Sequence, residues 1–218
     1  MEIIKPSIEI LNPKGMEQGI QILKDIEIAG RTCYKSEDKI TDTSYEKFIL
    51  MLTARGHEAM IEHGSMQVRI ICDRGVTHEI VRHRIASFAQ ESTRYCNYGK
   101  QGEIRVIDIA TGFNYDLNNH LDKMKYEVWQ KAMKQAEFAY MKMLDFGATP
   151  QEARSVLPNS LKTEIIVTAN LREWRHFFHL RNDKAAHPQM REVANMILIE
   201  AQKRIPLVFD NIKYASEK

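Results

Sequence analysis

Cysteine is scarce in this sequence. Its three cysteines, Cys33, Cys72 and Cys96, are spread over 218 residues. They are too few and too scattered for a disulfide framework or for a cysteine-ligated zinc site. A chain without either feature suits a reducing compartment. We therefore expect a cytoplasmic protein.

Long apolar runs and an excess of one charge are missing as well. No apolar run approaches the ~20 residues that cross a bilayer, and residues 1–6 lack the basic and apolar regions of a signal peptide. The 31 basic and 29 acidic residues leave a net charge of +2, whereas a dedicated nucleic-acid binder usually carries a strong basic excess. We therefore expect no membrane and no nucleic-acid partner. Any anionic ligand must be met by a local pocket.

Two common cofactor fingerprints are also absent. The sequence has no glycine-rich dinucleotide motif, which excludes a Rossmann-type site. His78 and His83 stand five residues apart, so on a helix they diverge by about 140°, whereas the four-residue spacing of a zinc protease gives about 40°. These two histidines cannot chelate one ion from a regular helix, and we expect no catalytic metal.

Apolar spacing and turn residues predict helices that alternate irregularly with strands. This pattern favours one α/β (α+β) domain over residues 1–218, with a mixed or antiparallel sheet flanked by helices. The expected strands cover residues 3–11 (an edge strand interrupted at Pro6), 65–72, 103–109 and 162–169. The expected helices cover 19–29 (closed by Gly30), 43–55 (capped within 42–44 and stopped by Gly56), a short segment capped by Thr77, 120–146, a short segment after the capping box of Thr149, a segment capped by Asn170, and 188–204.

The longest expected helix, 120–146, carries apolar residues at helical spacing. We expect them to form one core-facing stripe, in which methionine fills space between packed side chains. The stripe consists of Leu121, Met124, Val128, Met133, Phe138, Met141 and Leu144.

The most distinctive stretch is residues 82–95. It holds three arginines, a histidine, two serines, a glutamine and a glutamate, and residues 90–94 contain no apolar side chain. Arginine forks, hydroxyls and backbone N–H groups are the donors that hold phosphate or carboxylate. A charged, solvated surface loop is the alternative interpretation.

Taken together, these residues resemble the signature RHR-x2-S-x4-S-x-R-Y of the flavin-dependent thymidylate synthases. The signature is matched without a gap by Arg82-His83-Arg84, Ser87, Ser92, Arg94 and Tyr95. Further segments of the chain resemble other parts of that family. They are Gly56-His57-Glu58, Glu62-His63-Gly64-Ser65, Arg154-Ser155-Val156-Leu157-Pro158 and Asn170-Leu171-Arg172 through Leu180-Arg181, so the resemblance covers roughly residues 30 to 200.

The resemblance implies the thymidylate synthase-complementing protein fold and the methylation of dUMP to dTMP. Methylenetetrahydrofolate would be the carbon donor and FAD reduced by NADPH the hydride source, in a homotetramer whose subunits share active sites. The implied catalytic residues are Arg181 and Ser92. The implied dUMP-binding residues are Glu79, Ile80, Val81, Arg82, Gln90, Glu91, Ser92, Thr93, Arg94, Arg154 and Arg181. The implied FAD-binding residues are Ser65, Arg82, His83, Arg84, Gln90, Asn170, Leu171, Arg172, His176 and His63. For His63 the alternative is a structural role, as the hydrogen-bond partner of Glu62.

Several points stay open on the residues themselves. Gln90 stands where many family members have glutamate, and His176 where many have asparagine. Arg154 could instead pair with Glu152 or Glu164.

Cys96 has Arg94 two residues away, a setting in which a cysteine could act as a nucleophile, yet the resembled family works without a thiolate adduct, which favours a packing role. A non-enzymatic nucleotide- or RNA-binding module using the same basic loop is the alternative function.

Overall fold

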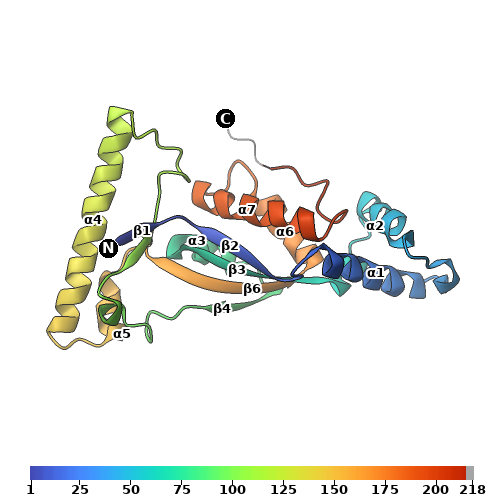
Figure 1. Ribbon diagram of the computed structural model, residues 1–218, viewed down its shortest axis with the longest axis horizontal. Helices are drawn as coiled ribbons and strands as arrows, with labels where there is room; N and C mark the ends of the chain where they lie inside the picture. The colour runs from blue at the N-terminus through green and yellow to red at the C-terminus, as the bar shows by residue number, and fades with distance from the viewer. Residues whose placement is uncertain (215–218) are drawn as a thin grey trace.

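The computed structural model describes residues 1–214 and is built around a four-stranded antiparallel sheet of order β2-β3-β6-β4 (Figure 1). The central strands β3 (Ser65–Asp73) and β6 (Lys162–Asn170) pair along their whole length. The edge strands are β2 (Ser7–Asn12) and β4 (Ala86–Gln90). Every second residue of β3 and β6 is buried, as the alternation in the sequence predicts for a sheet with one covered face.

A second, two-stranded sheet pairs β1 (Glu2–Ile4) in parallel with β5 (Arg105–Ile107). The predicted strand over residues 3–11 is therefore two strands in different sheets, separated at Pro6, which has no N–H for a ladder. Its second half is an edge strand, as expected. The predicted strand over 103–109 is extended only at 105–107. With antiparallel and parallel pairs flanked by helices, the mixed α/β fold is confirmed.

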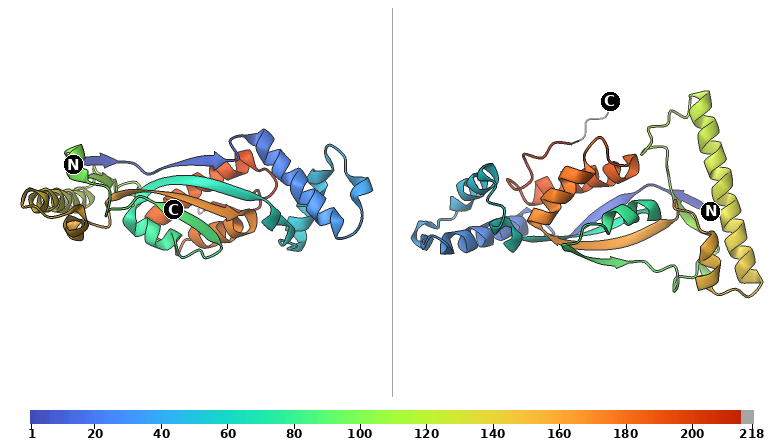
Figure 2. Two further views of the ribbon diagram at one scale, coloured as in Figure 1. Left: turned by 90° about the horizontal axis from the view of Figure 1, so that it is seen from below. Right: turned by 180° about the vertical axis from the view of Figure 1, so that it is seen from behind.

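Helices lie at both ends of the main sheet and over one of its faces (Figures 1 and 2). Helices α6 and α7 cover that face, α1 and α2 lie at one end, and α4 stands across the other end. The helices are α1 (Met16–Thr32), α2 (Ser44–Arg55), α3 (Arg74–Ile80), α4 (His120–Asp145), α5 (Pro150–Ala153), α6 (Leu171–Arg181) and α7 (Pro188–Arg204), and the 3-10 turns are η1 (Glu37–Lys39), η2 (Met60–His63), η3 (Tyr98–Gln101) and η4 (Arg154–Val156).

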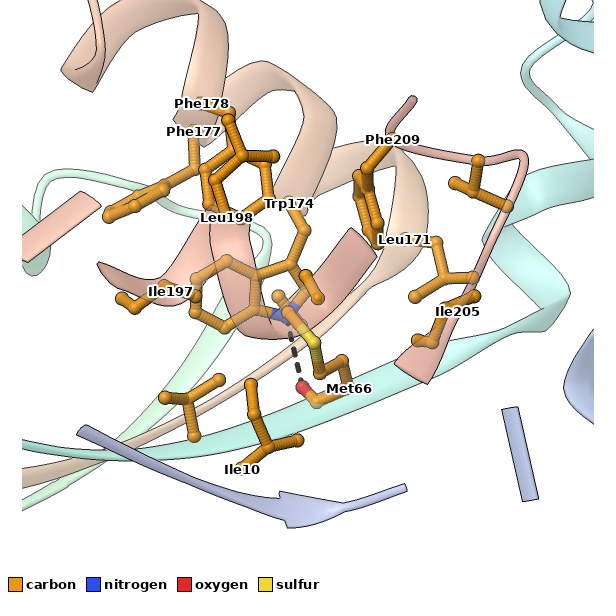
Figure 3. Close-up of a cluster of buried hydrophobic side chains, with 14 of the residues drawn as sticks. Ile10, Met66, Leu171, Trp174, Phe177, Phe178, Ile197, Leu198, Ile205 and Phe209 are labelled. Atoms are coloured by element: carbon orange, nitrogen blue, oxygen red, sulfur yellow. Dashed lines mark hydrogen bonds between the residues drawn. The ribbon is translucent and has the colours of Figure 1, made fainter. Parts of the chain in front are cut away.

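The main core lies between the sheet and the α6–α7 layer (Figure 3). Trp174 is fully buried there, and its indole N–H donates to the Met66 carbonyl at 2.9 Å. The Phe177 and Phe178 rings lie 5.2 and 5.9 Å from the Trp174 ring. This aromatic layer anchors α6 to β3 and so fixes which face of the helix points away from the core. A second apolar cluster, around Met133 and Tyr140, lies under α4.

Several helix ends differ from the prediction. Helix α1 continues through Gly30 to Thr32. Gly30 lies against the Phe48 ring of α2, where a Cβ would come within 2.5 Å, so the glycine serves close packing and does not end the helix. Helix α3 starts at Arg74 and is capped by Asp73, so the predicted cap at Thr77 was wrong. The caps of Thr149 and Asn170 are confirmed.

At α2, Gly56 ends the helix with φ +68 as expected, and the N-cap residue is Thr43, within the predicted 42–44. Thr43 makes no cap bond, and the Ser44 hydroxyl donates to Glu27 instead.

Only part of the predicted core stripe on α4 is buried. Met133 is buried, and Met141 and Leu144 pack against the second cluster. Because this helix meets the rest of the chain along one side of one half (Figure 1), the other stripe residues are exposed, at 49–69 % of their surface. They are Leu121, Met124, Val128 and Phe138.

No helix within residues 1–214 is both long and apolar enough to span a bilayer. The prediction of one domain over 1–218 stays a prediction, and its last residues, 215–218, lie outside the described range.

Candidate active site

Arg181, at the last position of α6, is held by three hydrogen bonds. Its Nε donates to Nε2 of His83 at 3.2 Å. Its two terminal nitrogens donate to the Glu79 carboxylate at 2.7 Å and to the Glu79 backbone carbonyl at 2.9 Å. The guanidinium is partly buried, with 16 % of the side chain exposed. Its orientation is therefore set by groups from α3 and from the turn that follows it.

The α6 side of this cluster follows from helical spacing. Glu173, Phe177 and Arg181 are four residues apart, so they lie on one face of the helix. That face meets His83, whose ring lies 4.9 Å from the Phe177 ring and whose Nδ1 lies 2.9 Å from a Glu173 oxygen. The sequence Arg82-His83-Arg84 thus places one buried histidine between two exposed arginines.

The His83 ring is neutral near pH 7. Burial lowers its pKa below the ordinary 6.5, and the Arg181 charge lowers it further, while the bond to Glu173 acts in the opposite direction. In a neutral imidazole one nitrogen donates and the other accepts. Since Arg181 can only donate, Nε2 accepts and Nδ1–H donates to Glu173.

His83, Glu173 and His176 also bring their potential metal-ligand atoms within 4.8 Å of one another. As possible metal ligands, the sequence suggested only the pair His78 and His83. It gave no sign of this grouping, which joins residues from two separate elements. Both nitrogens of His83 already have hydrogen-bond partners. An ion could use that ring only by displacing Glu173 or Arg181, so the prediction that the site uses no metal still stands as a prediction.

Two open clefts flank this part of α6. The first, of about 510 Å³, is polar and is lined by Asn170, Arg172 and His176, three of the predicted FAD-binding residues. The second, of about 530 Å³, is lined by Arg181 and Glu79. His179 borders both clefts.

In the first cleft, Arg172 forms an ion pair with Glu62 at 2.5 Å. The partner of Glu62 is therefore Arg172, not His63, and His63 is exposed. The Asn170 oxygen caps α6 by accepting from the Glu173 N–H at 2.8 Å, so its NH₂ is the part left for a ligand.

The other predicted residues near α6 differ in what they can offer. Ser65 is exposed and pairs with Asn170 across β3 and β6. Val81, Arg82 and Arg84 are exposed. The side chains of Ile80 and Leu171 are buried, so these two could offer a ligand only backbone groups.

The predicted phosphate-binding residues form a separate group beyond the other end of β4. Thr93 is buried and accepts a bond from Arg154 at 3.4 Å. Arg94 donates through Nε to Gln151 at 3.1 Å, and its backbone N–H donates to the Ser92 hydroxyl at 3.3 Å. The loop is thus fixed onto α5 and η4 through side chains that keep further donors available.

The alternative ion pairs of Arg154 do not form among the described residues. Glu152 closes the capping box of Thr149, and Glu164 pairs with Arg69 at 3.1 Å. The Gln90 and Glu91 side chains point inward, away from the phosphate-binding loop of residues 92–94. Gln90 donates to the buried Thr77 and Thr163, and Glu91 accepts from Lys162 and Tyr98.

The two groups are held apart by β4, so residues 86–90 are a strand where the sequence suggested a loop. Ala86 faces Ala169 across the sheet and Gln90 faces Ile165. Four steps of about 3.3 Å put the ends of β4 roughly 13 Å apart. Arg181 lies near the first end, through its bond to His83, and Arg94 lies beyond the second.

Cys96 lies just after the phosphate-binding group. It is half-buried and packs against the cluster around Tyr140, as expected for a packing role.

Sequence reasoning missed an apolar hollow of about 360 Å³ between α1 and α2, lined by Tyr34, Phe48, Met51 and His57 among others. The one feature of the sequence that pointed to this hollow was Gly30, a glycine inside a helix, which also lines it.

Comparisons with known proteins agree with these observations. The family model described as thymidylate synthase complementing protein matches residues 20–207. A protein of Pyrococcus furiosus named flavin-dependent thymidylate synthase is 36% identical over 176 residues, covering 80% of this chain and 70% of the relative. One of the same name from Geobacter sulfurreducens is 32% identical over 191 residues, covering 84% and 79%.

Among solved structures, a UMP/dUMP methylase, PolB from Streptomyces cacaoi bound with 5-Br dUMP, aligns over 96% of both chains with a TM-score of 0.76. At 24% identity this likeness establishes the fold.

Proposed function

The chain belongs to the family of the flavin-dependent thymidylate synthases, and we propose that it is an enzyme that converts dUMP to dTMP by reductive methylation. The observation that carries this proposal is the arrangement around α6. Arg181 is held by neutral His83 and by Glu79 at the edge of a cleft, next to a second cleft lined by Asn170, Arg172 and His176.

Arg181 is suited to the pyrimidine. A guanidinium has five N–H donors, and three are used within the chain. The remaining two, one on each terminal nitrogen, could bind the carbonyl oxygens of uracil. A fixed positive charge beside the ring stabilises the negative charge that develops when the pyrimidine is attacked.

Ser92, Arg94 and Arg154 are suited to the phosphate. Arg94 uses only its Nε on Gln151, which leaves its terminal N–H groups for an anion. Arg154 is exposed, and its hydrogen bond to Thr93 engages one of its terminal nitrogens. The Thr93 side chain is buried, so it fixes the loop while the neighbouring Ser92 is half-exposed.

The polar cleft fits part of a flavin cofactor. At about 510 Å³ it lies within the usual size range of small-molecule sites. Its lining combines three glutamates with the Arg172 guanidinium, the Asn170 amide and two imidazoles. The amide, guanidinium and imidazole groups can hold polar atoms of FAD, and Asn170 and Arg172 are the first choices. When bound, FAD reduced by NADPH supplies the hydride, and methylenetetrahydrofolate supplies the carbon. The residues of the chain bind and orient these groups. We propose that the enzyme acts in the cytoplasm.

The separation of the two arginine groups supports a homotetramer with shared sites. Arg181 and Arg94 lie beyond opposite ends of β4, whose ends are roughly 13 Å apart. A strand held in register along its length by pairing with β6 does not shorten. We propose that one subunit binds the phosphate and a neighbouring subunit provides Arg181 for the pyrimidine.

An absorption spectrum of the purified protein tests the proposal. We expect flavin bands, bound in the protein as isolated or after addition of FAD, that shift when dUMP is added. Arg172→Ala should weaken FAD binding. Arg105→Ala is the matched control, because this exposed arginine pairs with Glu2 in the small sheet, far from α6. A protein that stays colourless and does not bind added FAD would contradict the proposed enzyme and favour a nucleotide- or RNA-binding module.

A further inference from the structure

Glu173 makes an unusual contact for its position in α6. It is the third residue of the helix after the cap Asn170, and a glutamate there commonly reaches back to the backbone N–H of the cap, as Glu152 does in α5. The Glu173 carboxylate bonds Nδ1 of His83 at 2.9 Å instead. Both side chains are shielded, with 11 % and 5 % of their surface exposed. The contact joins residues 90 positions apart in the sequence.

This contact determines which nitrogen of His83 carries the proton. A carboxylate only accepts, so it requires Nδ1–H, and the neutral ring then presents an Nε2 lone pair. That lone pair faces the Nε–H of Arg181 at 3.2 Å. With the proton on Nε2 instead, two donors would face each other, and the carboxylate would face a lone pair. Only one tautomer satisfies both contacts.

The His83 contact in turn limits how Arg181 can turn. Glu79 holds the two terminal nitrogens, and His83 holds Nε. Three contacts on three nitrogens fix the plane of the guanidinium, whereas Glu79 alone would allow it to rotate about its ion pair. The two N–H groups of Arg181 that remain for a ligand, one on each terminal nitrogen, then point in a fixed direction.

We infer that Glu173 is a positioning residue, which fixes the His83 tautomer and thereby aims Arg181 at the pyrimidine of the substrate. This inference rests on the proposed function, because it assigns the pyrimidine to Arg181. Glu173 also lines the first cleft, so the FAD affinity of each Glu173 variant is measured as well, and its link to Arg181 runs through the bond to His83. Its carboxylate is needed as a hydrogen-bond acceptor and not as a charge.

The test compares Glu173→Ala with Glu173→Gln in the holoenzyme. The amide oxygen of glutamine still accepts from Nδ1–H, so this variant should retain the tautomer and dUMP affinity close to wild type. Alanine removes the acceptor. We expect it to weaken dUMP binding and to lower kcat by roughly tenfold each, the effect of about 1.4 kcal/mol. Glu9→Ala, which removes an exposed partner of Arg69 on the main sheet, is the control.

The tautomer is measured directly by solid-state ¹⁵N NMR of protein labelled in histidine, with the His83 signals identified by their loss in His83→Gln. Wild type and Glu173→Gln should show a protonated Nδ1 and an unprotonated Nε2, and Glu173→Ala a mixture. A protonated Nε2 in wild type overturns the inference. So does a Glu173→Ala protein with unchanged tautomer and dUMP affinity. Should Glu173→Ala not fold, wild type and Glu173→Gln decide by the same signals.

Failure of the proposed function is distinguishable from failure of this inference. A wild-type protein that binds no dUMP would overturn the function. The ¹⁵N signals, which need no ligand, would then still decide whether Glu173 fixes His83.

Discussion

Exchange of subunits between two variants that each bind dUMP weakly, assayed below saturating dUMP, tests whether the site is shared. Arg94→Ala removes a guanidinium beyond one end of β4, and Arg181→Ala removes one near the other end. Each lost charge-assisted hydrogen bond is worth about 1.5–3 kcal/mol. Each variant alone should therefore lose about one to two orders of magnitude in dUMP affinity, in every site of the tetramer.

Mixing the two variants should restore some of the sites. If one subunit supplies Arg94 and a neighbour supplies Arg181, an intact site needs the Arg181→Ala chain for its loop and the Arg94→Ala chain for its pyrimidine contact. After unfolding and refolding of an equal mixture, each choice has a probability of one half. Roughly a quarter of the sites is then intact, provided that the interface is symmetric. Turnover should recover to about that fraction of wild type.

The assay follows dTMP formation, with hybrid tetramers counted by native mass spectrometry. Each variant refolded alone corrects for losses during refolding. A mixture of Arg94→Ala with Arg94→Ala,Arg181→Ala is the matched control, because no chain in it has an intact loop and no recovery is possible. Hybrids that form without any recovery would refute the reasoning, since both arginines would then act within one chain.

Three further changes follow from single contacts. Cys96→Ala should keep substantial dTMP formation, because Cys96 only packs against the second cluster, and loss of turnover in a folded, flavin-bound protein would revive a thiolate mechanism. Asp73→Asn keeps an acceptor for the Val76 N–H, which is bonded at 2.7 Å, whereas Asp73→Ala removes it. The alanine variant should lower the free energy of unfolding, measured in urea, by about 1 kcal/mol. Burial raises the pKa of Asp73 above 3.8, so the carboxyl contributes fully below pH 3.8, and this stability is lost as pH rises through the folded pKa. The stability of the Asn variant relative to wild type should then increase as pH rises above 3.8, and a difference that does not change with pH would contradict this. Trp174→Phe removes the donor to Met66 and leaves a void, which should cost about 2–4 kcal/mol, and an unchanged urea midpoint would show that the contact is dispensable.

The sequence predicts well wherever a local pattern has one physical solution. Alternation in residues 65–72 identifies the buried positions of β3, because successive side chains of a strand point to opposite faces. The capping box of Thr149 and the cap of Asn170 are confirmed for the same reason, since a helix start needs acceptors for its first N–H groups. The Thr77 cap failed because Asp73, a stronger competitor, offers its carboxylate to Val76 one turn earlier.

The candidate site is predictable as a set of residues but not as an arrangement. The family resemblance names His83 and Arg181, yet no local pattern shows that the two meet, 98 residues apart, or that Glu173 joins them. Nor does it show that β4 separates Arg94 from Arg181. Residues 86–90 alternate only weakly, so the polar types around them suggest a loop. Pairing with β6, settled by the tertiary fold, makes them a strand.

Helix α4 shows the limit of periodicity most directly. Helical spacing identifies which side chains share a face, but it does not say what covers that face. Two faces of α4 are apolar. One carries Met133 and Tyr140 and is buried within the chain, and the other carries Leu121, Met124 and Val128 and is exposed. Exposed apolar surface of this kind is typical of contacts between proteins. Periodicity therefore identified the residues that share each face of α4, but not which face the rest of the chain covers.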